Sequence, residues 1–138
     1  MENTIYRIII AGGRDFNDYE MLRKEALQAI RKAFCKIDKS HVYIISGRAK
    51  GADSLGERFA DEFGLNKVEF PANWDKYGKS AGFRRNEQMA DFAKGKNEEN
   101  QENIKGMLIA FWDGKSHGTK HMIELAKNKK LLVEVIKY

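Results

Sequence analysis

The sequence predicts an α/β protein in which one doubly wound parallel sheet of about five strands carries helices on both faces. Short, nearly continuous apolar runs recur along the chain, as expected for strands covered on both sides. Segments with apolar residues at helical spacing separate these runs. Several of the runs also end in loops that contain glycine. This alternation favours parallel strands joined by right-handed crossovers.

Length and composition fit one folded domain, residues 1–138. The chain is 42% hydrophobic and 33% charged, so it can form a core without disulfides or metal. Its net charge of +5 makes a polyanionic partner worth testing. The basic residues are spread along predicted helices, however, so nucleic-acid binding is not favoured.

The single cysteine, Cys35, excludes an internal disulfide framework and fits a reducing compartment. It lies on a predicted apolar helix face, which favours a buried structural thiol. No apolar run approaches the roughly 18 residues that a membrane span needs, and the N-terminus lacks a signal-peptide pattern. We therefore expect a cytoplasmic protein without membrane contact.

Ile5 to Ala11 predicts the first strand. Gly12 and Gly13 follow it and permit close backbone approach to a ligand, and the guanidinium of Arg14 suits a phosphate or carboxylate. A tight turn with a surface arginine is the alternative interpretation. The next helix is expected to open at Asn17.

The second strand, Val42 to Ile45, runs into the basic loop from Ser46 to Gly51. A helix is predicted from Ala52 until Gly64 stops it. A strand, a glycine loop and a helix start in succession offer free backbone N–H groups to an anion. Asp53 is expected to cap this helix; a hydrogen bond to a sugar hydroxyl is its functional alternative.

A short third strand is predicted from Lys67 to Phe70. The segment Ala72–Gly82 is expected to be a loop. Its Trp74 and Tyr77 either stack on a planar ring such as a nucleobase or pack the loop onto the domain.

The following helix is predicted over Phe83–Ala93. Arg84 and Arg85 lie near its start, where positive charge is unfavourable for the helix dipole. They indicate a nearby anion, or else a solvated charged turn.

The uniformly polar stretch Lys94–Asn103 predicts a mobile surface loop. Met107–Trp112 predicts the fourth strand, which ends in the loop Asp113–Thr119. A helix from Thr119 to Asn128 and a final strand, Leu131–Ile136, complete the pattern. Thr119 is expected to cap its helix or to donate to a phosphate oxygen.

In a doubly wound sheet, ligands bind beyond the carboxyl ends of the strands. Because the loops described above follow strands, we expect them to meet at one edge. The loops Gly47–Gly51 and Gly114–Thr119 each offer amides and a helix N-terminus to a phosphate.

Several familiar sites are excluded by the pattern. Gly114-Lys115-Ser116 resembles the end of a Walker A loop, but Ile109 occupies the position of its first glycine. The first strand lacks a following GxGxxG, which argues against a dinucleotide dehydrogenase. His117 and His121 have no evident third ligand, so no metal site is expected.

Five motifs carry a family resemblance: Gly12–Phe16, Ser46-Gly47 through Gly51–Asp53, Trp74–Lys79, Arg85-Asn86, and Phe111–Thr119. In this order they resemble the YspA-type, cpYpsA-related branch of the SLOG superfamily. The resemblance implies a Rossmann-like domain that binds nucleotide-derived ligands, such as NAD-related molecules, ADP-ribose derivatives or nucleoside phosphates. It also implies a role in phage or bacterial conflict, and kinship with LOG phosphoribohydrolases and with the DNA-processing protein DprA.

The kinship with LOG enzymes implies a homodimer. LOG enzymes also carry two sequence motifs, R-K-x-x-M and P-G-G-x-G-T-x-x-E. Arg85 and Met89 match the first motif, although Asn86 replaces its lysine, and Gly118 and Thr119 match the second. Met122 occupies the position of the catalytic glutamate. Since a thioether cannot activate water or stabilise an oxocarbenium centre, this departure disfavours hydrolysis.

We therefore expect binding or sensing of a nucleotide-derived ligand, with no required cofactor. Cleavage of a nucleoside monophosphate N-glycosidic bond is the first alternative, with Arg85, Glu87 and Asp113 as catalytic candidates, and DprA-like single-stranded DNA binding is the second. The predicted ligand-binding residues are Gly12, Gly13, Arg14, Ser46, Gly47, Arg48, Gly51, Asp53, Trp74, Tyr77, Arg85, Asn86, Asp113, Gly114, Ser116, Gly118 and Thr119.

Overall fold

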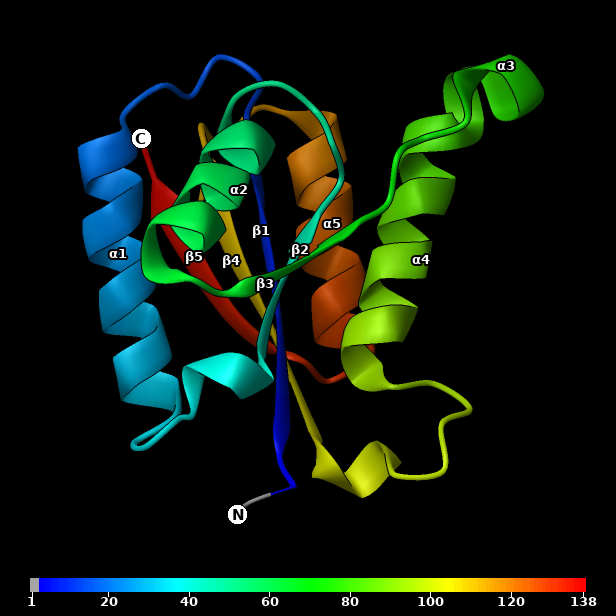
Figure 1. The fold of residues 1–138 in the computed structure, drawn as a ribbon. Helices are drawn as coiled ribbons and strands as arrows, with labels where there is room; N and C mark the ends of the chain where they lie inside the picture. Colours follow the sequence, from blue (N-terminus) through cyan, green and yellow to red (C-terminus); the bar gives the residue numbers. More distant parts are fainter. Residues whose placement is uncertain (1–2) are drawn as a thin grey trace.

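A computed structural model describes residues 3–138 and has the expected α/β architecture (Figure 1). Its five strands form one sheet in the order β3-β2-β1-β4-β5, and every neighbouring pair is parallel. The prediction of a doubly wound, Rossmann-like sheet is thus confirmed. The strands are β1 (Ile5–Gly12), β2 (Val42–Ser46), β3 (Asn66–Glu69), β4 (Ile104–Trp112) and β5 (Leu132–Lys137).

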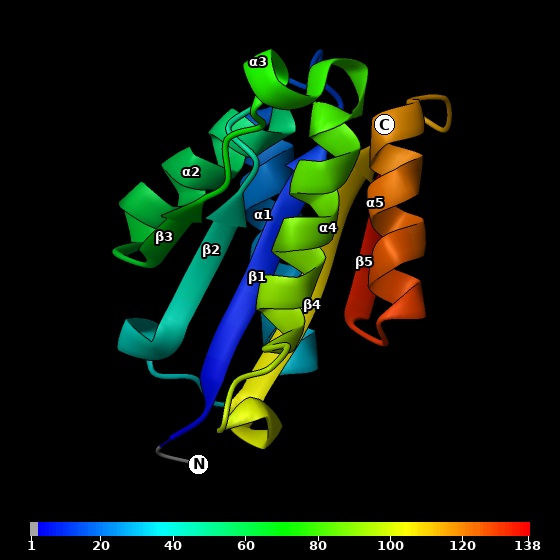
Figure 2. The same ribbon diagram turned by 90° about the vertical axis from the view of Figure 1, so that its right-hand side faces the viewer.

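Helices cover both faces of the sheet. Two of them, α1 and α2, pack on one face, and α4 and α5 pack on the other (Figures 1 and 2). The short helix α3 lies at the N-terminal end of α4 (Figure 1). The helices are α1 (Tyr19–Ala33), α2 (Ala52–Phe63), α3 (Trp74–Tyr77), α4 (Ala81–Lys94) and α5 (His117–Asn128), and 3-10 turns occur at Lys39–His41, Gly78–Ser80 and Gln101–Asn103.

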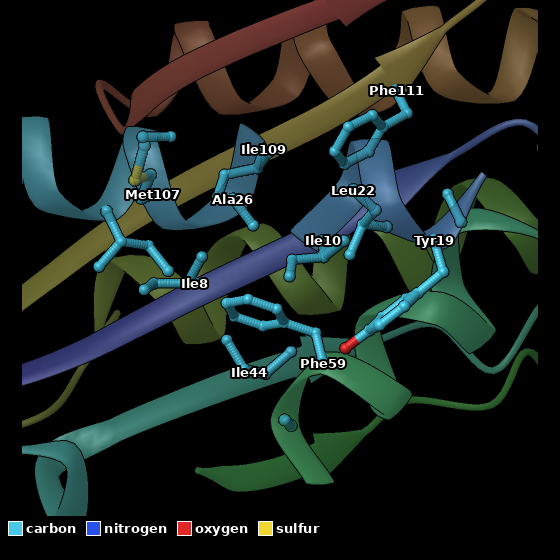
Figure 3. Close-up of a cluster of buried hydrophobic side chains, with 14 of the residues drawn as sticks. Ile8, Ile10, Tyr19, Leu22, Ala26, Ile44, Phe59, Met107, Ile109 and Phe111 are labelled. Atoms are coloured by element: carbon cyan, nitrogen blue, oxygen red, sulfur yellow. The ribbon is translucent and has the colours of Figure 1, made fainter. Parts of the chain in front are cut away.

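The central strands are apolar throughout because helices cover both faces of the sheet. In β1, Ile8 and Ile10 face the cluster under α1 and α2, whereas Ile9 faces α4 and α5. In β4, Ile109 and Leu108 alternate in the same way (Figure 3 shows the cluster under α1 and α2). Successive strand residues point to opposite faces, so a strand covered on both sides must be apolar at every position. Each such side chain contributes roughly 1.5–3 kcal/mol through burial.

Two helix starts differ from the sequence prediction. Asp18, not Asn17, is the N-cap of α1, because its Oδ1 accepts the N–H of Met21 at 3.0 Å. Ser116, not Thr119, caps α5, which therefore begins at His117. A capping side chain accepts the N–H of the residue three positions later. Several consecutive polar residues could do this at each helix start, so the sequence did not indicate which of them is the cap.

The predicted loop Ala72–Gly82 is largely helical instead. Asn73 caps α3 by accepting the N–H of Lys76 at 3.1 Å, and a 3-10 turn then leads directly into α4. As a result α4 begins at Ala81, two residues before the predicted start. Small and polar residues are typical of loops, so the sequence pattern did not indicate this capped helical turn.

Cys35 is exposed and lies beyond the end of α1, so the prediction of a buried helical thiol is wrong. The apolar period of α1 continues into Phe34, but the backbone there is already extended. Beyond this error, the ends of β3, β4 and β5 differ from prediction by at most three residues.

The polar stretch Lys94–Asn103 is attached to the sheet at one point. Glu98 forms a salt bridge with Arg7, which is 8% exposed and also donates to the carbonyl oxygen of Phe92 at 2.8 Å. The Arg7 guanidinium lies 3.9 Å from the centre of the Phe92 ring. This contact holds the middle of the stretch against β1.

Within residues 3–138, none of the helices has the length and apolar character needed to cross a membrane.

Candidate functional site

A cavity of about 470 Å³ opens at the carboxyl edge of the sheet. Loops that follow β1, β2 and β4 reach this edge, together with the N-terminal ends of α4 and α5 (Figure 2). The strand order reverses between β1 and β4, which is where ligands bind in doubly wound folds. The predicted convergence of distant loops at one edge is therefore observed.

Backbone contacts join the loops after β1 and β2. The carbonyl oxygen of Gly13 accepts the N–H of Ala52 at 3.2 Å, and the N–H of Gly13 donates to Phe111 at 3.1 Å. Gly51 has a φ of +77°, and a Cβ there would overlap the Gly13 carbonyl oxygen. A glycine is required at position 51 because two backbones meet there.

Arg85, from the second turn of α4, reaches across the cavity to the loop after β2. Its Nη1 donates to the carbonyl oxygen of Gly47, and its Nε donates to Oδ1 of Asn86 at 3.1 Å. Burial lowers the pKa of Arg85; the charge of Asp53 opposes this shift, and the charge of Arg14 adds to it. Within residues 3–138, Nη2 has no hydrogen-bond partner.

Asp53 is 5% exposed and lines the cavity beside Arg85. Burial raises its pKa to about 6, although the N–H of Ala49, donating at 3.2 Å, and the charge of Arg85 favour the ionised form. Asp53 does not cap α2: the N-cap is Gly51, which makes no side-chain capping bond. Asp53 instead fixes the loop before the helix.

Asn86 joins α4 to α5. Its Nδ2 lies 3.3 Å from the carbonyl oxygen of Gly118, to which it donates, and 3.2 Å from Nδ1 of His121. Asn86 is 6% exposed, so these partners satisfy an amide that is removed from water. Burial lowers the pKa of His121, which favours the neutral ring that can accept this bond.

The loop after β4 is closed by Asp113. Its Oδ1 accepts the N–H groups of Lys115 and Ser116, each at 2.8 Å, and these bonds lower the pKa of Asp113. Ser116 in turn caps α5 and lies 3.2 Å from the hydroxyl of Thr119. Asp113 therefore stays ionised next to the N-terminus of α5.

Aromatic side chains stand at the rim of the cavity. Trp74 is 51% exposed and Phe83 is 48% exposed, and both line the cavity. Phe83 also packs on His121, with ring centres 4.4 Å apart. Tyr77 lies outside the cavity, where the guanidinium of Arg84 covers its ring at 4.4 Å.

Most of the predicted binding residues line this cavity, but the basic loop after β2 largely does not. The polar groups of that loop bond other protein groups instead. The N–H of Arg48 donates to Ser46 Oγ, and the Arg48 side chain forms a salt bridge with Glu57. The predicted residues that line the cavity are Gly12, Gly13, Arg14, Asp53, Trp74, Arg85, Asn86, Asp113, Ser116, Gly118 and Thr119. Those that do not are Ser46, Gly47, Arg48, Gly51, Tyr77 and Gly114.

Eight further lining residues were not among the predicted ligand-binding residues: Ala11, Asp15, Ala49, Lys79, Gly82, Phe83, Met89 and Met122. For Asp15 and Lys79, their place in the family motifs was the available signal. Of the three catalytic candidates, Arg85 and Asp113 line the cavity, whereas Glu87 is exposed and outside it. Met122, at the position of the LOG glutamate, is buried in the cavity wall. Within residues 3–138, no three His, Cys, Asp or Glu side chains are grouped to hold a metal ion.

The chain is similar to a known protein family. The family model described as "YspA, cpYpsA-related SLOG family" matches residues 6–77, from β1 to the end of α3. This match covers more than half of the 138 residues. No curated protein matches the chain. The chain therefore belongs to the YspA, cpYpsA-related SLOG family, and this membership indicates a nucleotide-related binding or processing role.

Proposed function

We propose that the cavity binds a nucleotide-derived ligand, such as ADP-ribose, an NAD-related molecule or a nucleoside phosphate, through its phosphate groups. The observation that carries this proposal is the like-charge pair of Arg14 and Arg85 in one cavity. Arg85 is partly removed from water, and the charge of Arg14 disfavours its protonated form further. A bound anion relieves both effects, and Nη2 of Arg85 is available to bond it.

Other parts of the cavity suit the rest of a nucleotide. A Cβ at Gly82 would lie 3.5 Å from the Trp74 ring and 3.8 Å from Nη2 of Arg85. The aromatic surface and the free guanidinium nitrogen therefore approach the same point. A base stacked on Trp74 would have a phosphate within reach of Arg85. Lys79 adds positive charge to the cavity.

Hydrolysis of an N-glycosidic bond remains the alternative function. Asp15, Asp53 and Asp113 bring carboxylates to the cavity, but each is already held by a hydrogen bond. Backbone N–H groups hold Asp53 and Asp113, and the Tyr138 hydroxyl holds Asp15. Met122 contributes no acid or base at the position where the LOG motif has glutamate. Binding without turnover is the stronger proposal. Release of free adenine from AMP by the wild-type protein, lost in Arg85→Ala, would support hydrolysis instead.

Calorimetric titration with ADP-ribose, NAD, AMP and cyclic ADP-ribose tests the proposal. Arg85→Ala should weaken binding of the best ligand at least about tenfold, since it removes charge-assisted hydrogen bonds. Arg84→Ala is the matched control, because Arg84 is exposed and contacts Ser80 and Tyr77. Absence of heat across the panel, or equal losses in both variants, would contradict the proposal.

Three further expectations belong to this proposal. Homodimerisation and a role in biological conflict follow from the family resemblance, and sedimentation velocity tests the first. A cytoplasmic location is proposed from the single cysteine. DNA binding would instead show affinity that falls steeply with salt and is insensitive to Arg85→Ala.

A further inference from the structure

Two carboxylates occupy adjacent positions at the edge of the cavity. Asp15 follows β1 and Asp113 follows β4, and these strands pair as far as Gly12 and Phe111. Both carboxylates act on the hydroxyl of Tyr138: Asp15 accepts its hydrogen bond at 2.6 Å, and the charges of Asp15 and Asp113 add to the effect of burial in raising its pKa. The backbone N–H of Tyr138 also donates to the carbonyl oxygen of Trp112, the residue before Asp113, at 3.3 Å, so Tyr138 contacts the chain beside each carboxylate.

Each carboxylate is fixed through one oxygen. Oδ1 of Asp15 is held by Tyr138, and Oδ1 of Asp113 is held by the two backbone N–H groups of its own loop. For both side chains, the other oxygen has no hydrogen-bond partner among residues 3–138. Neither aspartate forms a salt bridge within that range. Fixed orientation with a free acceptor is the arrangement expected of a specificity contact.

The cavity therefore has two chemically different parts. Arg85 bonds the loop after β2 and lies beside Asp53. Asp15 instead bonds Tyr138, and Asp113 closes the loop after β4. A phosphate is attracted to the first part and repelled by the second. Ionised carboxylates are acceptors only, so the second part requires a donor on the ligand, and sugar hydroxyls are donors on a phosphorylated nucleoside.

We propose that Asp15 and Asp113 accept hydrogen bonds from adjacent hydroxyl groups of the ligand's sugar, and so select ribose-containing phosphates over their deoxy counterparts. This inference rests on the proposed function and deepens it. A site that hydrogen-bonds a hydroxyl rejects the analogue without it, because the protein group is then left unpaired. The same selection would disfavour DNA.

Calorimetric titration with AMP, 2′-deoxy-AMP and 3′-deoxy-AMP tests the inference, in buffer with EDTA so that no divalent cation bridges the carboxylates. AMP should bind at least about tenfold more tightly than either deoxy analogue. Asp113→Asn and Asp15→Asn keep the oxygen that bonds the protein but replace the free acceptor with a donor. In each variant the ratio of AMP to deoxy-AMP affinity should fall, because a neutral amide bonds a sugar hydroxyl more weakly than an ionised carboxylate does.

The outcomes separate the inference from the function on which it rests. Equal affinity for AMP and both deoxy analogues, or an unchanged ratio in both variants, overturns the selection of ribose while leaving phosphate binding intact. A requirement for Mg²⁺ also overturns it, since the carboxylates would then hold a cation. If neither AMP nor ADP-ribose binds, and inorganic phosphate does not bind either, the proposed function itself fails.

Discussion

Arg85 donates a hydrogen bond from Nη1 to the backbone carbonyl oxygen of Gly47, which lies 38 positions earlier in the sequence. This contact connects the second turn of α4 to the loop after β2. It uses one side of the guanidinium and leaves Nη2 without a partner among residues 3–138. Gly47 does not line the cavity, yet it sets the position of a residue that does.

Gly47→Ala should weaken ligand binding without touching the ligand. A Cβ at position 47 would lie 2.7 Å from Nη1 of Arg85 and 2.8 Å from Oδ2 of Asp53, so the guanidinium must move. We expect a loss of affinity of about tenfold, comparable to that of Arg85→Ala. Arg48→Ala, at the adjacent position, removes ion pairs with Glu57 and Glu69 that lie outside the cavity, and is the control. Calorimetric titration of the two variants measures their ligand affinities. Equal affinities would show that Gly47 does not position Arg85 for binding.

Two substitutions at Gly82 should separate stability from binding. In Gly82→Ala the new methyl group makes ordinary contacts at 3.5 and 3.8 Å, and alanine stabilises a helix relative to glycine by roughly 0.5–1 kcal/mol. Gly82→Leu should retain the fold but occupy the space between Trp74 and Arg85. Chemical denaturation should show increased stability for alanine, and titration should show a loss of affinity only for leucine. Unimpaired binding by Gly82→Leu would place the ligand elsewhere.

Asp53 should make the protein less stable as pH rises from about 4 to 6. Burial raises its pKa in the folded state to about 6, so in this window the folded protein holds a proton that the unfolded chain releases. The difference of about two units corresponds to about 3 kcal/mol. Asp53→Asn keeps an acceptor for the N–H of Ala49 and should lack this dependence. Urea denaturation across pH measures the difference between the two proteins; parallel curves would show that Asp53 does not titrate there.

Glu98→Gln should reduce stability without affecting the cavity. Glu98 neutralises the buried guanidinium of Arg7, but it is itself partly exposed, so we expect a loss of only about 1 kcal/mol. Glu99→Gln, at the neighbouring exposed position, is the control. Urea denaturation should distinguish the two variants, whereas their ligand affinities should be equal. A loss of ligand affinity in Glu98→Gln would show that Glu98 also affects the cavity, which would contradict this prediction.

The sequence predicted the sheet because its signals are local. Apolar runs such as Ile8 to Ile10 identify strands covered on both faces, and glycine at position 64 marks the end of α2. The cavity edge followed from topology alone, since the carboxyl ends of parallel strands must meet. Arg14 and Arg85 were therefore placed correctly in the same cavity.

The remaining features depend on contacts between distant residues. Whether the amides after Ser46 face a ligand or their own side chains is decided by Asp53 and Glu57, whose rotamers the sequence does not reveal. The bond from Tyr138 to Asp15 spans 123 positions. Cys35 was misplaced because helical spacing of apolar residues continues past the actual end of α1.

Arg14 and Arg85 are proposed to bind the phosphate of the ligand between them. A crystal structure of the protein with AMP at saturating concentration would locate the bound nucleotide. We expect its phosphate to be bonded to Nη2 of Arg85 within the cavity at the carboxyl ends of β1 and β4. A nucleotide bound on an exposed basic helix face, with the cavity free of it, would refute phosphate binding by these two arginines.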